Sequence, residues 1–100
     1  MLDLSSDQLN QVRGILRCRV PEARVLVFGS RATRCARRYS DLDLALVSPE
    51  SLSYRVLFEL EEDFSESDLP FRVDIVDLAR VDEAFRRRVL SQSLEILPGG

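Results

Sequence analysis

The sequence predicts a small α/β protein, an α+β sandwich in which helices pack on one mixed sheet of three to four strands. Short aliphatic runs with strand character alternate with longer segments whose apolar residues recur at the helical period. The length of 100 residues corresponds to one domain with one core. We therefore expect a single domain over residues 1–100, with elements in the order α-β-α-β-α-β-α.

The first helix is expected to begin at Ser5, because Ser5 and Gln8 have the spacing of a capping box. Its core-facing stripe consists of Leu9, Val12, Ile15 and Leu16. The strand that follows runs from about Arg24 to Phe28. It is apolar and free of Gly and Pro, so we expect it to be buried on both faces.

Gly29 and Ser30 end this strand and precede a ten-residue spacer, Arg31–Ser40. Glycine permits a turn that a side chain would block, and it lets a ligand approach the backbone closely. A short helix opening at Ser30 would present backbone N–H groups to an anion. Arg31 is the best candidate for a phosphate contact among the four spacer arginines. A simple turn and a solvated arginine face are the alternatives.

The second strand is expected at Asp41–Val47. Its residues alternate, so that three leucines share one face while Asp41 and Asp43 share the other with Ala45. The two carboxylates would lie about 7 Å apart along the strand. Like charges this close are unfavourable unless a cation lies between them. Asp41 and Asp43 are therefore candidate metal ligands, and a solvated strand face is the alternative.

A second helix is expected to begin with Ser48 as its cap and Pro49 at its first position. The acidic cluster Glu59–Asp68 lies at its end and in the following loop. The cluster is either a solvated helix end or a docking surface for a basic partner. A last helix starts near Asp82, with Arg86–Arg88 largely outward, and Leu94–Leu97 forms a strand or a docking segment.

The third strand is expected at Phe71–Val76 and carries Asp74 in its apolar interior. A carboxylate in that position is unfavourable unless it is paired or bound to a metal. Asp74 is therefore a further candidate metal ligand, and an ion pair with Arg72 or another arginine is the alternative. Asp77 is three residues further on, so it points to the opposite face and should face water or shape a turn.

The composition excludes several kinds of chemistry. The chain has no His, and all 14 of its basic residues are Arg, so His ligation, His catalysis and lysine-dependent sites are excluded. Cys18 and Cys35 lack metal-type spacing, so any metal site needs oxygen ligands, which favours Mg²⁺ or Mn²⁺. The net charge of −3 argues against direct nucleic-acid binding. Without a signal peptide or membrane-spanning run, a cytoplasmic protein is expected.

The segment VLVFGSRATRCARRYSDLDLALV resembles the signature of the polymerase-β-type nucleotidyltransferase superfamily. That signature has Gly-Ser at a strand end, a spacer of about ten residues and Asp-x-Asp on the next strand. Within the superfamily, GSRA…SDLDLAL is most similar to the minimal nucleotidyltransferases (MNT), which are often paired with HEPN-domain partners in toxin–antitoxin modules. The later VDIV and the order of elements extend the resemblance over most of the chain.

The resemblance implies the polymerase-β-type fold and a role for each motif residue. Gly29, Ser30 and Arg31 would bind the triphosphate of a nucleotide. Asp41, Asp43 and Asp74 would be the catalytic carboxylates and would hold two Mg²⁺ ions, with Mn²⁺ as the other possible metal.

The implied activity is transfer of a nucleoside monophosphate, AMP from ATP, to a hydroxyl group. The family pairing suggests a tyrosine of a HEPN-type toxin partner as acceptor, so that the chain would act as an antitoxin. The alternative is a non-catalytic antitoxin, a binding module that neutralises its partner by direct contact.

Overall fold

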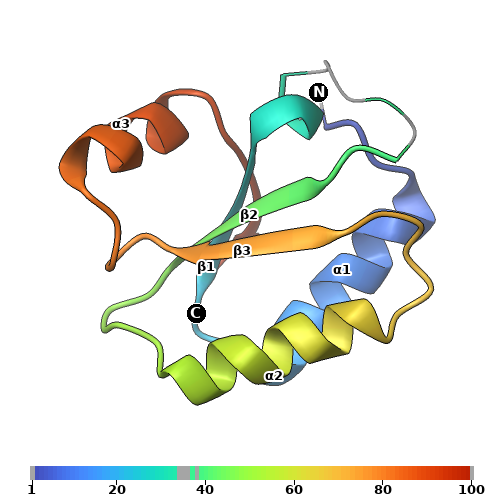
Figure 1. The fold of residues 1–100 in the computed structure, drawn as a ribbon, viewed down its shortest axis with the longest axis horizontal. Helices are drawn as coiled ribbons and strands as arrows, with labels where there is room; N and C mark the ends of the chain where they lie inside the picture. The colour runs from blue at the N-terminus through green and yellow to red at the C-terminus, as the bar shows by residue number, and fades with distance from the viewer. Residues whose placement is uncertain (1, 34–36, 38, 100) are drawn as a thin grey trace.

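The computed structural model describes residues 2–33, 37 and 39–99, and it confirms the α+β class with a mixed sheet (Figure 1). Arg34, Cys35 and Arg38 of the spacer lie outside the described residues. The order of elements is α1 (Ser6–Arg19), β1 (Arg24–Phe28), η1 (Gly29–Arg31), β2 (Leu42–Val47), α2 (Tyr54–Ser65), β3 (Val73–Asp77), α3 (Glu83–Ser91) and β4 (Leu94–Pro98).

The strands of the described residues form one sheet in the order β3-β2-β1-β4. β1 is antiparallel to both of its neighbours, β2 and β4, whereas β2 and β3 are parallel. The apolar segment Leu94–Leu97 is thus part of a strand that pairs with β1, and of the two alternatives, a strand or a docking segment, the strand is confirmed. Within the described part of the chain, no helix is both long and apolar enough to cross a membrane.

The sheet has a core on each face. Figure 1 shows α1 and α2 together on one side of the sheet and α3 on the other. Consecutive residues of β1 alternate between the two cores: Val25 and Val27 pack with α1 and α2, while Leu26 packs with α3. All three are at most 2% exposed, so β1 is buried on both faces as predicted. In β2 the three leucines face α1 and α2, and Ala45 faces α3.

The helix caps are partly as predicted. Ser5 and Gln8 form the predicted capping box, and Asp82 caps α3 by accepting a hydrogen bond from the Phe85 N–H at 2.8 Å. The predicted start of α2 at Ser48 was wrong, because Ser53 is the cap and accepts from the Val56 N–H at 3.1 Å. The Ser48 hydroxyl instead donates to the Glu50 carbonyl within the preceding loop.

The arginines of α3 do not all point outward as expected. Arg87 and Arg88 are exposed, but Arg86 is partly buried and donates from Nη2 to the Leu78 carbonyl at 2.6 Å. This bond fastens α3 to the loop that follows β3, so the outward placement predicted for Arg86 was wrong.

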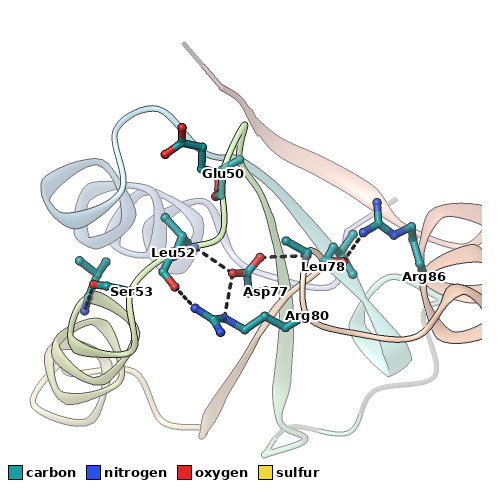
Figure 2. A network of polar contacts seen from close by, with 10 residues as sticks. Glu50, Leu52, Ser53, Asp77, Leu78, Arg80 and Arg86 are labelled. Carbon is teal, nitrogen blue, oxygen red and sulfur yellow. Dashed lines mark hydrogen bonds and ion pairs between the residues drawn. The ribbon is translucent and has the colours of Figure 1, made fainter.

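Asp77 joins the end of β3 to the loop before α2 (Figure 2). Its Oδ2 accepts a hydrogen bond from the Leu52 N–H at 3.0 Å, and its Oδ1 accepts one from the Ala79 N–H at 3.0 Å. Arg80 pairs with Oδ2 at 3.4 Å and also donates to the Leu52 carbonyl. Asp77 shapes a turn, as predicted, but it is 4% exposed and does not face water.

Asp77→Asn is expected to lower the free energy of unfolding by about 1–3 kcal/mol, because asparagine has one acceptor oxygen for the Leu52 and Ala79 N–H groups and no charge to pair with Arg80. Asp82→Asn is the matched control, since asparagine caps a helix as well as aspartate does. Urea denaturation of both variants measures the difference. Equal stability of Asp77→Asn and wild type would contradict the role of Asp77 at this junction.

Candidate active site

Two of the three candidate carboxylates are direct neighbours in the sheet. Asp43 of β2 is paired in register with Asp74 of β3, and adjacent strands lie about 4.8 Å apart. Both strands run in the same direction, so the two side chains point to the same face. This is the face that carries Ala45 and Val76 and is packed by α3. Asp77 has the opposite parity in β3 and contacts the loop before α2.

Asp41 completes the group. It lies one residue before β2 and is exposed, whereas Asp43 is partly buried. The pKa of Asp43 is raised, first by burial, then by the charge of Asp74 and then by that of Asp41. Asp43 is therefore paired with Asp74 in the sheet and is within electrostatic range of Asp41.

These carboxylates have the oxygen donors that Mg²⁺ and Mn²⁺ prefer. Among the described residues no basic group forms an ion pair with Asp41 or Asp43. A bound cation would relieve the repulsion that raises the pKa of Asp43, so the donor set fits such an ion. The described side chains do not form a ready-made cluster of three or more metal-binding groups.

Asp74 also makes the ion pair considered as its alternative. Arg72 Nε lies 3.1 Å from Asp74 Oδ1. The side chains are 77% and 41% exposed, respectively. An exposed pair of this kind contributes at most about 1 kcal/mol, so the pair does not prevent Asp74 from binding another group.

Gly29 is packed against the carboxylate of Asp43, a contact that the sequence analysis missed. Its φ is +73°, a conformation that favours glycine. A Cβ on Gly29 would collide with Asp43 Oδ2 and would lie 3.3 Å from Asp43 Cγ. In the sequence, only the place of the glycine at the end of a strand, before the spacer and the Asp-x-Asp motif, pointed to this contact. The contact itself depends on the register between β1 and β2.

The turn after β1 is shorter than the helix expected there. η1 is a single 3₁₀ turn in which the Ala32 and Thr33 N–H groups donate to the Gly29 carbonyl at 3.1 and 3.2 Å. Ser30 lies in this turn, directly after the glycine that packs against Asp43.

The Arg31 side chain does not point into solvent, as a phosphate contact would require. It is 5% exposed and donates to the backbone carbonyls of Asp3 and Ser40. Its guanidinium also stacks on the Phe71 ring, 4.1 Å from the centroid. The structure therefore does not support Arg31 as a phosphate ligand, because its guanidinium is committed to the protein interior.

The acidic cluster Glu59–Asp68 is partly neutralised within the chain. Arg19 of α1 bonds Asp63 at 2.6 Å and lies 3.6 Å from Glu59. The hydrogen bond from Arg19 lowers the pKa of Asp63. Glu61, Glu62, Glu66 and Asp68 are exposed, so these members of the cluster form a solvated surface.

Asp43→Asn is expected to stabilise the ligand-free protein at neutral pH. An acid whose pKa is raised by folding contributes stability below its ordinary pKa of about 3.9, and loses that stability as the pH rises through the raised value. Asparagine does not titrate, so its advantage should appear above about pH 4 and grow towards neutrality. Melting temperatures in chelator at about pH 3.5 and about pH 7 measure this. An advantage of equal size at both pH values would contradict the electrostatic origin.

Comparison with known proteins identifies the family. The family model "Polymerase beta, Nucleotidyltransferase" matches residues 10–98. The chain is 49% identical over 85 residues to a Haemophilus influenzae protein named probable protein adenylyltransferase MntA, and the match covers 85% of this chain and 75% of that protein.

Solved structures share the fold. One is a toxin–antitoxin crystal structure with AMP-PNP, with a TM-score of 0.78 and 26% identity over 90% of this chain and 73% of the other. Another is a complex of a tri-AMPylated Shewanella oneidensis HEPN toxin with an MNT antitoxin, with a TM-score of 0.71 over 90% of this chain and 69% of the other. At 24% identity, that second likeness concerns the fold alone. From its family match and its similarity to MntA, the chain belongs to the polymerase-β-type nucleotidyltransferases.

Proposed function

We propose that this nucleotidyltransferase is a Mg²⁺-dependent adenylyltransferase that moves AMP from ATP onto a tyrosine hydroxyl of a HEPN-type toxin. It would thereby act as a cytoplasmic antitoxin. The observation that carries the proposal is the pairing of Asp43 with Asp74 on adjacent parallel strands, with Asp41 close enough to raise the pKa of Asp43. Three acids held together at an energetic cost are expected where a cation and a phosphate must bind.

The roles follow from the positions of the residues. Asp41, Asp43 and Asp74 would hold two Mg²⁺ ions, or Mn²⁺, which when bound stabilise the charge on the attacking and leaving oxygens. Gly29 packs closely against the Asp43 carboxylate, and Gly29 and Ser30 would bind the triphosphate. Asp74, with its side chain 41% exposed, is accessible to an acceptor hydroxyl and can take its proton.

The transfer exchanges a phosphoanhydride bond of ATP for a phosphodiester bond to the acceptor. The acceptor oxygen forms a bond to the α-phosphorus of ATP, and the bond from that phosphorus to the bridging oxygen breaks. Pyrophosphate leaves, the hydroxyl proton passes to a carboxylate, and AMP remains on the acceptor. The chain's own residues thus orient the nucleotide and receive the proton.

The similar proteins support the nucleotide and the partner. The Haemophilus relative is named as a protein adenylyltransferase, and the 26% identical structure is a toxin–antitoxin complex containing AMP-PNP, an ATP analogue. A HEPN-type partner agrees with the family resemblance of the GSRA…SDLDLAL segment.

Labelled ATP distinguishes this function from neutralisation by contact alone. The protein is incubated with Mg²⁺, a HEPN-type protein of the same organism and ATP labelled on either the α- or the γ-phosphate. The proposal predicts that α-label reaches the partner and that γ-label does not, because the γ-phosphate leaves with pyrophosphate. A partner that is bound and neutralised without acquiring α-label would identify the chain as a non-catalytic antitoxin.

A further inference from the structure

Arg31 is a buried cation that connects separate parts of the chain near the carboxylates. Its Nε and Nη2 donate to the Ser40 carbonyl at 3.1 and 2.8 Å, and its Nη1 donates to the Asp3 carbonyl at 2.9 Å. The Asp3 N–H returns a hydrogen bond to the Arg31 carbonyl at 3.0 Å. The Phe71 ring lies against the guanidinium. The N-terminal segment, the turn after β1, the end of the spacer and the approach to β3 therefore meet at one side chain.

Asp41 needs support of this kind, because the sheet does not provide it. The β1–β2 pairing ends at Phe28 and Asp43, and the β2–β3 pairing begins at Leu42 and Val73. Asp41 lies before both ends and is exposed. The paired residues of β2 therefore begin only after Asp41, and no described strand pairing includes Asp41 itself.

Hydrogen bonds to the residues on either side of Asp41 hold its backbone. The Ser40 carbonyl belongs to the planar peptide unit that leads into Asp41, so the two N–H groups of Arg31 set the orientation of that unit. On the other side, the Leu42 N–H donates to the Arg72 carbonyl at 2.9 Å, and Arg72 directly follows the Phe71 ring. Arg31 and the segment that enters β3 thus supply the hydrogen bonds on the two sides of Asp41.

We propose that Arg31 is a positioning residue for Asp41. It acts through the Ser40–Asp41 peptide and contacts no substrate phosphate. The inference rests on the proposed role of Asp41 and Asp43 in nucleotide transfer, and it assigns the arginine of the GSRA segment a structural task behind the site. The planar guanidinium is needed because it donates two parallel hydrogen bonds to one carbonyl while stacking on a ring, and a lysine ammonium cannot do both.

Arg31→Lys tests the inference, with Arg13→Lys as the matched control. Arg13 Nε also donates to a distant backbone carbonyl, that of Ile96, at 2.9 Å, but between α1 and β4. Arg31→Lys is expected to lower kcat about 10- to 100-fold through misplacement of Asp41. The KM for ATP should change by less than about threefold, because both carboxylates that would hold the nucleotide's metal are kept and only the position of Asp41 shifts. Arg13→Lys should lose a similar amount of melting temperature with unchanged kcat.

Three outcomes would settle the assignment. If Arg31→Lys raises the KM for ATP while kcat is unchanged, Arg31 is a phosphate ligand and the inference is overturned. It is also overturned if Arg31→Lys behaves like Arg13→Lys in both constants. An active Asp43→Asn, measured in parallel, would instead overturn the proposed site and the inference with it.

Two further measurements keep the test decisive if Arg31→Lys folds poorly. Phe71→Leu removes the ring under the guanidinium and should lower kcat in the same direction with an unchanged KM. Amide hydrogen exchange at Leu42 should accelerate in both variants while exchange at Val25 and Val27 in the core does not. Unchanged kcat and unchanged exchange in Phe71→Leu would overturn the inference.

Discussion

Asp74→Asn is expected to abolish transfer while much of the ATP binding remains. Asp41 and Asp43 would still hold the metal that accompanies the nucleotide, but the carboxylate nearest the acceptor could no longer take a proton. A loss of about 10²–10⁴-fold in kcat is typical for removal of a positioned acid or base. Label transfer measures the activity, and the rise in melting temperature with ATP and Mg²⁺ measures binding, because a ligand of the folded state stabilises it. Asp43→Asn should lose both signals.

Asp77→Asn is the control for this prediction. Asp77 is in the same strand but faces the loop before α2, so its removal should reduce stability and leave the activity of the folded protein unchanged. Transfer by Asp74→Asn together with inactivity of Asp77→Asn would show that the wrong carboxylate of β3 had been assigned to the site.

Gly29→Ala is expected to lower both kcat and the free energy of unfolding, although glycine has no side chain that could take part in catalysis. The alanine Cβ would collide with Asp43 Oδ2, and the φ of +73° is strained for any side chain. Displacement of the Asp43 carboxylate by about 1 Å would lower kcat about 10²-fold. The strained backbone would lower the free energy of unfolding by about 1–3 kcal/mol.

Gly14→Ala is the matched control. Apart from the helix's own backbone and the two chain neighbours, no atom of the described residues lies within 4 Å of a Cβ at that position in α1, so alanine should stabilise the helix by up to about 1 kcal/mol without affecting transfer. Activity assays and urea denaturation of both variants separate the two effects. A Gly29→Ala variant with wild-type kcat would show that the Asp43 carboxylate does not depend on the glycine.

Features that depend on local sequence could be predicted. The bounds of β1, the capping box at Ser5 and the cap at Asp82 follow from hydrophobic runs and from side chains that bond the backbone three residues away. The shared face of Asp41 and Asp43 follows from the period of a strand. The grouping of Asp74 with them required more, namely the resemblance to a family, because the parallel β2–β3 register is a long-range feature.

Features that depend on distant contacts could not be predicted. The start of α2 is set by Ser53 after a loop that Asp77 holds through the Leu52 N–H, so the local Ser48-Pro49 signal was overridden. Arg31 resembles a solvent-facing phosphate ligand in the sequence, but its partners are 28 and 9 residues away. The packing of Gly29 on Asp43 could not be predicted either, because it follows from the pairing of β1 with β2 across the spacer.

The central claim is that Asp41, Asp43 and Asp74 together transfer AMP to a partner. The most direct measurement is the intact mass of a HEPN-type partner that is co-expressed with the wild-type chain or with the Asp43→Asn variant. We predict that the partner gains the mass of one or more adenylyl groups with the wild type and none with the variant, although both chains fold and the variant is the more stable without ligand. An equal gain of mass with both chains, or none with either while the partner is still neutralised, would contradict the account.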